Sequence, residues 1–252
     1  MKTSRIILLV NLMLLLSACQ TVAVNSDPEK AAKLNASLGV AYMQKGQNEL
    51  AMEKLNKALE QDSSNADVHH YLAELYRRLN VSDKAEQYFL SAMELSPGDS
   101  AIKNNYAAFL CQQGTVDAAY KIFEAVLADP LYVNKGRVLE NKAFCAQLTG
   151  NIKLAHENFV LATKFNPRLT RSLLALAQIE FDEQNIDEAY KYFTRFTQNS
   201  KHTPQSLWLG ILLEKQRGNK NRVASFSTLL RGMYPDSKEA QLLQKLKKRG
   251  VL

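Results

Sequence analysis

A 34-residue period constrains this chain more than any other feature of its sequence. Residues 66–99 read ADVHHYLAELYRRLNVSDKAEQYFLSAMELSPGD, and two amphipathic helical runs flank a polar break at 80–82. Small residues in the two runs allow helices to approach closely, and large residues fill the space between them. The residues that define the pattern are Leu72, Ala73, Tyr76, Ala85, Phe89, Ala92 and Pro97.

The same pattern recurs in frame along most of the chain. The unit before it begins at Ala32, the unit after it begins at Ser100, and the frame resumes at Gly136 after two extra residues. The last unit, from Pro204, retains the fewest matching residues, as expected of a terminal repeat whose outer face meets solvent. The predicted units are 32–65, 66–99, 100–133, 136–169, 170–203 and 204–237.

This pattern resembles the tetratricopeptide repeat, in which each unit is a pair of helices. The resemblance implies an all-α fold, a right-handed superhelical solenoid of six helix pairs. Beyond the sixth unit, Ser237 to Leu246 reads as an amphipathic helix with an apolar stripe of Ala240, Leu242, Leu243 and Leu246. We therefore expect residues 238–252 to form a capping helix over the sixth repeat, followed by a basic tail.

The composition is that of a globular helical protein. The chain is 46% hydrophobic and 23% charged, with 10 Gly and 6 Pro in 252 residues. This length would suit one or two compact domains, but the repeats indicate an elongated stack in which each unit contacts only its neighbours.

Residues 1–18 have the features of a signal peptide. Lys2 and Arg5 precede an apolar run from Ile6 to Leu16 that is too short to span a bilayer. The tetrapeptide Leu16-Ser17-Ala18-Cys19 then resembles the lipobox of bacterial lipoproteins. That resemblance implies diacylglycerol on the Cys19 thiol, cleavage before Cys19 and acylation of the new amino terminus. The alternative is an ordinary secretory peptide with a coincidental cysteine.

The residue after the predicted lipid site bears on the membrane that would hold it. In Gram-negative lipoproteins an Asp there usually signals retention in the inner membrane, and this chain has Gln20. The resemblance therefore implies a lipid anchor in the outer membrane, on its periplasmic face. We expect residues 19–31 to be a lipidated tether that leads to a helix start near Pro28.

Positive charge gathers near the C-terminus. Removal of the signal peptide would leave 30 Lys and Arg against 25 Asp and Glu. Much of the excess lies in residues 238–249, where the charge suits the C-terminal end of a helix. We interpret it as a solvated charged end. Contact with nucleic acid or anionic lipid is the alternative, and export from the cytoplasm argues against nucleic acid.

Two cysteines other than Cys19 remain for the exported fold. Cys111 and Cys145 occupy the first helices of neighbouring repeats at similar heights. Neighbouring helix axes lie about 8–10 Å apart, so facing sulfur atoms could meet in an oxidising compartment. We predict a Cys111–Cys145 disulfide, with two buried free thiols as the alternative.

The sequence has no motif typical of catalysis. It lacks a glycine-rich phosphate loop and a nucleophile elbow, and its histidines lack metal-ligand spacing. The histidines are His69, His70, His156 and His202. We therefore predict a protein that is not an enzyme, with no metal, no cofactor beyond the acyl chains on Cys19, and no small-molecule substrate. An enzymatic role, as a glycosidase helper, remains the alternative.

A peptide-binding surface is the remaining candidate site. In tetratricopeptide stacks the first helices line the concave face, and a chaperone-type Lys/Asn/Asn/Lys/Arg clamp is not in frame here. We therefore expect an apolar or amphipathic peptide rather than a free carboxylate, although ordinary surface or inter-repeat packing is the alternative for each residue. The candidate contacts are Lys33, Val40, Met43, Gln44, His70, Tyr71, Glu74, Arg78, Asn104, Asn105, Ala108, Glu140 and Phe144.

Two segments suggest a narrower family. NNYAAFLCQQG, with Cys111, and LENKAFCAQLTGN, with Cys145, resemble the central repeats of the type IV pilus biogenesis lipoproteins, the PilF/PilW family of pilotins. The resemblance implies a lipoprotein that binds secretin subunits and promotes their localisation and multimerisation in the outer membrane, as pilus assembly and twitching motility require. The alternative is a scaffold for another envelope machine, in outer-membrane protein assembly or peptidoglycan synthesis.

Overall fold

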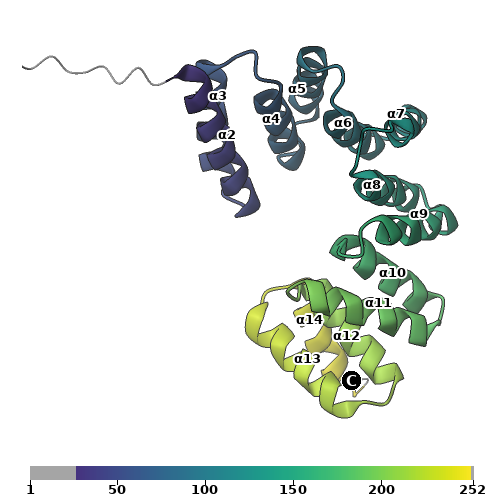
Figure 1. The fold of residues 1–252 in the computed structure, drawn as a ribbon. Helices are drawn as coiled ribbons and strands as arrows, with labels where there is room; N and C mark the ends of the chain where they lie inside the picture. Colours follow the sequence, from purple (N-terminus) through teal and green to yellow (C-terminus); the bar gives the residue numbers. More distant parts are fainter. Residues whose placement is uncertain (1–26, 251–252) are drawn as a thin grey trace, which may run out of the picture. The chain divides into compact units, whose positions relative to one another are not determined.

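The described part of the chain, residues 27–250 of a computed structural model, contains helices and no strands (Figure 1). The predicted signal peptide and Cys19 lie outside the described residues. No helix within 27–250 is long and apolar enough to cross a membrane. The chain divides into two compact units, residues 1–95 and 96–252, which we describe separately.

The first unit contains two helix pairs. Its core joins α2, α3 and α4 through buried side chains that include Leu55, Val68 and Leu72. In chain order its helices are α2 (Pro28–Gln44), α3 (Asn48–Gln61), α4 (Ala66–Arg78) and α5 (Ser82–Leu95).

The second unit contains four further helix pairs and one last helix. Its largest core cluster lies at the C-terminal end, where Phe193, Phe226 and Leu243 are buried together. In chain order its helices are α6 (Ser100–Gln112), α7 (Val116–Ala128), α8 (Lys135–Leu148), α9 (Ile152–Phe165), α10 (Thr170–Asp182), α11 (Ile186–Asn199), α12 (Pro204–Gln216), α13 (Lys220–Met233) and α14 (Lys238–Lys248).

The helix starts follow the predicted repeat frame, and an all-α tetratricopeptide fold is confirmed. From the second repeat onward, the first helices begin within one residue of the predicted starts. The two extra residues lie in the connection 129–134, which has six residues where the other connections between repeats have four.

The first helix, α2, begins at Pro28, where the sequence indicated a helix start, so residues 28–31 are its first turn rather than part of the tether. The Asp27 carboxylate accepts hydrogen bonds from the backbone N–H groups of Glu29 and Lys30, at 3.2 and 3.4 Å. Pro28 occupies the first helical position, where its missing N–H costs nothing.

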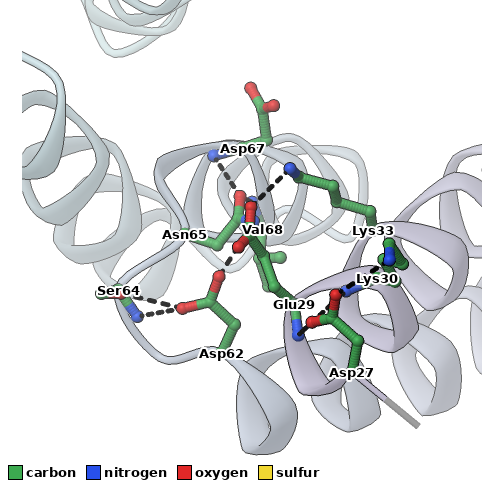
Figure 2. Close-up of polar contacts among 9 residues, drawn as sticks. All are labelled: Asp27, Glu29, Lys30, Lys33, Asp62, Ser64, Asn65, Asp67 and Val68. Carbon is green, nitrogen blue, oxygen red and sulfur yellow. Dashed lines mark hydrogen bonds and ion pairs between the residues drawn. The ribbon is translucent and has the colours of Figure 1, made fainter.

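The second repeat begins with the same kind of cap (Figure 2). The Asn65 side chain accepts from the N–H groups of Asp67 and Val68, at 3.1 and 3.4 Å. Asp62 accepts from both the backbone and the hydroxyl of Ser64 in the connection before it. Asp99 and Thr203 cap the first helices of the third and sixth repeats in the same way, whereas Leu169 before α10 makes no side-chain cap.

The three-residue turn inside each helix pair needs a left-handed residue at its centre. Glycine fills this place in four repeats, and the other two have Asn80, with φ of 56°, and Gln184, with φ of 64°. Asparagine tolerates this conformation and glutamine is less suited to it, so the fifth repeat carries a strained turn.

Small buried residues set the distance between paired helices. A Cβ placed on Gly39 would lie 2.6 Å from Leu55 Cγ, so only glycine fits against that side chain. Ala73, Ala107, Ala143 and Ala177 are fully buried at the equivalent position of the next four repeats. In the first five repeats, helices within a pair thus approach closely because the sequence leaves this position nearly without a side chain.

The capping helix forms as predicted, with one exception. α14 covers the end of the stack with Ala240 and Leu243, which are buried, and the Ser237 hydroxyl accepts from the Ala240 N–H at 3.1 Å. Leu242, predicted to lie in the apolar stripe, is 40% exposed, because the face that α14 buries is narrower than the run of leucines suggests.

The two central cysteines are joined in a disulfide between α6 and α8. Their Cα atoms lie 5.7 Å apart, and the bridge links residues 34 positions apart in sequence. Both side chains are buried, at 6% and 1% exposure. The bridge thus connects the third and fourth repeats, which the longer connection 129–134 separates.

A buried carboxylate connects the fourth and fifth repeats. Glu140 on α8 is fully buried, at 0% exposure. It accepts hydrogen bonds from the Ser172 backbone N–H and hydroxyl on α10, at 3.2 and 2.9 Å. The Arg137 guanidinium pairs with its other oxygen at 2.6 Å. Because each oxygen has partners, the charge is held without an unsatisfied group.

Removal of the disulfide should destabilise the second unit. A Cys111→Ala/Cys145→Ala variant should lose about 4 kcal/mol of unfolding free energy, because the unfolded chain regains the freedom of a 34-residue loop. Urea unfolding followed by the fluorescence of Trp208 measures this. Alkylation of both cysteines in protein that was never reduced would show that the bridge does not form.

Loss of the buried charge should also cost stability. Glu140→Gln should lower the unfolding free energy by about 2 kcal/mol, because charge-assisted hydrogen bonds are replaced by neutral ones in a buried site. Glu157→Gln, on an exposed position of α9, is the matched control and should change it by less than about 0.5 kcal/mol. Equal stability of the two variants would contradict the structural role of Glu140.

Candidate peptide-binding site

Most of the predicted contact residues reach the surface of their own unit. Lys33, Val40, Gln44, Tyr71, Glu74 and Arg78 do so in the first unit, and Asn105, Ala108 and Phe144 in the second. All lie on the first helices of their repeats. The remaining four predicted contacts do not reach the surface.

Met43, His70, Asn104 and Glu140 are buried, at 6%, 8%, 2% and 0% exposure, so little of each side chain is open to a partner. Met43 belongs to the core of the first unit. The His70 ring stacks on Tyr71, with centroids 5.6 Å apart. Asn104 accepts from the Asn141 side chain at 3.3 Å, and Glu140 binds Ser172. Asn104 and Glu140 thus contact neighbouring repeats, and His70 contacts Tyr71 and Phe89 of its own repeat.

Charged groups on the first unit's candidate face are mostly paired within the unit. Arg78 donates to the Met43 carbonyl at 2.7 Å, which ties the second repeat to the first. Glu74 pairs with Arg77 at 2.7 Å, and Lys33 pairs with Glu29 at 2.6 Å. The hydrogen bond from Lys33 to Glu29 raises the pKa of this lysine above its ordinary value. Val40 and Tyr71 supply the half-buried apolar surface between these pairs.

The second unit has a cavity on its first helices, which we call the glutamine groove. Its volume is about 360 Å³. Every lining residue comes from α8, α10 or α12, so the groove crosses three consecutive repeats. The lining residues are Phe144, Gln147, Arg171, Leu174, Ala175, Gln178 and Gln205.

Phe144 is the aromatic centre of this groove. Its ring meets the Phe159 ring edge-on, with centroids 4.8 Å apart. The guanidinium of Arg171, on α10, lies 4.2 Å from the centroid of the Phe144 ring. The side-chain N–H of Gln178 donates to the Asp182 carboxylate at 2.8 Å, and this hydrogen bond does not use the carbonyl oxygen of Gln178. The groove therefore offers an apolar face, a cation and several amides, which together suit an extended or helical peptide with apolar side chains.

A second cavity of the same unit lies where the longer connection joins α6, α8 and the end of α9. We call it the asparagine pocket, and its volume is about 460 Å³. Its rim carries exposed apolar side chains, with Val133 at 86% and Phe165 at 60% exposure. The lining residues include Asn104, Asn105, Asn134, Arg137, Asn166 and Leu169.

Asp129 holds the connection that forms this pocket. Its carboxylate accepts from the Ser100 hydroxyl at 2.7 Å and from the Leu131 N–H at 2.9 Å. These hydrogen bonds, led by that from Ser100, lower the pKa of Asp129 below its ordinary value. The carboxylate is thus ionised at neutral pH, where it keeps the connection in place. Burial of Tyr132 in the same connection raises the pKa of its phenol.

Sequence reasoning missed two parts of this surface. Arg171, Gln178 and Gln205 occupy the same positions within their repeats as the predicted contacts, so extension of the rule to the fifth and sixth repeats would have found them. The pocket residues of the connection 129–134 have no repeat position, because they lie at the insertion. The only signal was the apolar run Leu131-Tyr132-Val133.

The described surface has features of binding and lacks a metal cluster. No group of three or more His, Cys, Asp or Glu side chains within residues 27–250 could hold a metal ion. The two cavities contain amides, cations and an aromatic ring on rigid helices. Such an arrangement can position a partner segment by shape and hydrogen bonds.

Comparisons with known proteins agree with this architecture. A TPR-repeat family model matches residues 39–80, and a tetratricopeptide-repeat model matches residues 69–101. The chain is 30% identical to the type IV pilus assembly protein PilF of Pseudomonas aeruginosa, over 86% of each chain.

Solved structures extend the comparison to the fold. The structure of P. aeruginosa PilF superposes with a TM-score of 0.68 at 29% identity, over 86% of this chain and 98% of that one. The structure of PilW, described as a widely conserved type IV pilus biogenesis factor, gives 0.67 at 26% identity, over 84% and 98%. The repeats, the capping helix and these similarities together place the chain in the PilF family of type IV pilus assembly proteins.

Proposed function

We propose that this protein is an outer-membrane lipoprotein that binds secretin subunits of the type IV pilus and promotes their localisation and multimerisation. The glutamine groove is the observation that carries the binding part of this proposal. It presents Phe144 and three glutamine amides across α8, α10 and α12, and no residue in it resembles a catalytic group. In this proposal the protein binds secretin subunits and positions them at the membrane, and it catalyses no reaction.

The groove supports a peptide ligand on physical grounds. Aromatic residues in partly dry sites supply most of the binding energy of such interfaces, and amides around them pair with a partner's backbone. The Cys111–Cys145 disulfide holds α6 against α8, and the hydrogen bonds from Ser172 to Glu140 hold α10 against α8, so little ordering is required when a segment binds. A partner segment with apolar side chains would match Phe144 and Leu174.

The proposed anchor supplies the second half of the mechanism. Acyl chains on Cys19 would contribute about 0.8 kcal/mol for each buried methylene, enough for firm attachment when several chains are present. A tether joining this anchor to the repeats would raise the local concentration of bound secretin at the membrane. No cofactor beyond the acyl chains and no chemical step is required.

Groove variants test the binding proposal. Phe144→Ala should weaken binding of the purified chain to the secretin of its own pilus by about 30-fold, since an aromatic hot spot contributes about 2 kcal/mol or more. Gln178→Arg should weaken it as well by placing a large cation in the groove, and it leaves the core untouched. Surface plasmon resonance gives both affinities.

Matched substitutions outside the groove provide the control. Leu161→Ala on α9 and Gln198→Arg on α11 remove or add similar groups on exposed positions of second helices. They should bind secretin as the unaltered chain does. Capture of a barrel-assembly or cell-wall enzyme from solubilised envelope, with no secretin, would instead indicate a scaffold for another envelope machine.

The anchor is tested separately. Cys19→Ser should abolish acyl labelling of the exported chain and shift secretin multimers away from the outer membrane in fractionated cells. The repeats should still fold and bind secretin in solution, because residues 27–250 contain all the described helices. Secretin multimers that remain correctly placed in this variant would contradict the tether mechanism.

A further inference from the structure

The net positive charge of the described chain comes from its C-terminal end. Residues 217–250 contain nine Lys and Arg and two acidic residues, Asp236 and Glu239. Residues 27–216 contain 21 Lys and Arg against 23 Asp and Glu. The repeats are therefore close to neutral, and the end formed by α13 and α14 is strongly basic.

This charge surrounds a groove between α13 and α14, the two helices that end the stack in Figure 1. The groove has a volume of about 320 Å³. Arg231 of α13 lines it together with Lys247 and Lys248 of α14, and the Gln241 and Gln244 side chains add amides beside the cations. Three cations and two amides around one hollow form a site for a phosphate-sized anion.

These cations lack acidic partners within the described residues. Some lysines elsewhere are paired with nearby acidic residues, as Lys142 is with Glu124 and Lys54 with Glu53. No ion pair within residues 27–250 includes Arg231, Lys245, Lys247 or Lys248. Arg231 instead donates to the Ser227 carbonyl at 3.2 Å, which fixes its guanidinium at the groove. The electrostatic potential of the α13–α14 end is therefore positive toward the solvent.

Exposed aliphatic side chains accompany the charge. Leu229 and Met233 of α13 and Leu242 of α14 are 42%, 54% and 40% exposed. Aromatic platforms, on which nucleic-acid bases stack, do not line the groove. At helical spacing these aliphatic residues lie on the side of each helix away from Arg231 and Lys247, so the groove itself offers cations and amides. Such groups match the phosphates at the surface of an anionic bilayer.

We propose that the α13–α14 end binds the headgroups of anionic phospholipids, as a membrane contact separate from the Cys19 anchor. Arg231, Lys247 and Lys248 hold the phosphate. This proposal adds to the membrane-attached function proposed above, and only the cellular role of the contact depends on that function. Vesicle binding by unacylated protein does not depend on the anchor or on secretin.

The test uses the chain from residue 20, which keeps every described helix and carries no acyl group. Flotation with vesicles of phosphatidylglycerol and phosphatidylcholine should recover the protein, and vesicles of phosphatidylcholine alone should not. Each basic residue near an anionic surface contributes about fivefold in affinity, so Arg231→Gln/Lys247→Gln/Lys248→Gln should weaken binding by about 100-fold. Binding should also fall as salt is raised.

A charge-matched variant separates a site from net charge. Lys121→Gln/Lys153→Gln/Lys164→Gln removes the same charge from exposed positions on α7 and α9, and it should bind vesicles nearly as well as the unaltered chain. Equal weakening in the two triple variants, or no recovery with anionic vesicles, would overturn the proposal. Tighter binding to an oligonucleotide than to the vesicles would also overturn it.

Discussion

The close approach of paired helices is the constraint on which the rest of the structure depends. One nearly side-chain-free position in each of the first five repeats, such as Gly39 against Leu55, sets the spacing within a pair. Large side chains such as Phe89, Phe123 and Phe159 then fill the remaining space with no exposure. Because each repeat buries its apolar surface only against its neighbours, the first helices remain free to present a binding face.

Polar contacts between repeats limit the movement of that face. The disulfide joins α6 to α8, and Glu140 joins α8 to Ser172 on α10. Asp129 holds the longer connection between the third and fourth repeats against Ser100. These contacts lie beneath or beside the two cavities of the second unit. The cavities are therefore held by covalent and charge-assisted contacts and need little rearrangement to accept a partner.

The repeats, the capping helix and the cysteine pair could be predicted because each depends on local spacing. A 34-residue period places small and large residues on the same faces in every unit, whatever lies nearby. The state of a single surface residue depends instead on what covers it. Glu140 and Asn104 occupy the same repeat position as Leu174, which lines the glutamine groove, but here Ser172 and Asn141 lie close enough to form hydrogen bonds with them.

Insertions escape prediction for a related reason. Val133 and Phe165 meet at the asparagine pocket because two extra residues lengthen one connection, and no repeat position describes such residues. The basic end is different again, since its charge is plain in the sequence. The sequence does not show whether acidic side chains pair with these cations. The contacts of Arg231, Lys247 and Lys248 show that they do not.

The central claim is that partner recognition uses the first helices of the second unit. Site-specific photo-crosslinking tests it most directly, with a photoreactive amino acid placed at Gln178 on α10 and, in a second chain, at Gln198 on α11. The account predicts that the probe at Gln178 forms a covalent adduct with secretin in intact cells and that the probe at Gln198 does not. Adducts from Gln198 alone would place the binding surface on the opposite helices and contradict the account.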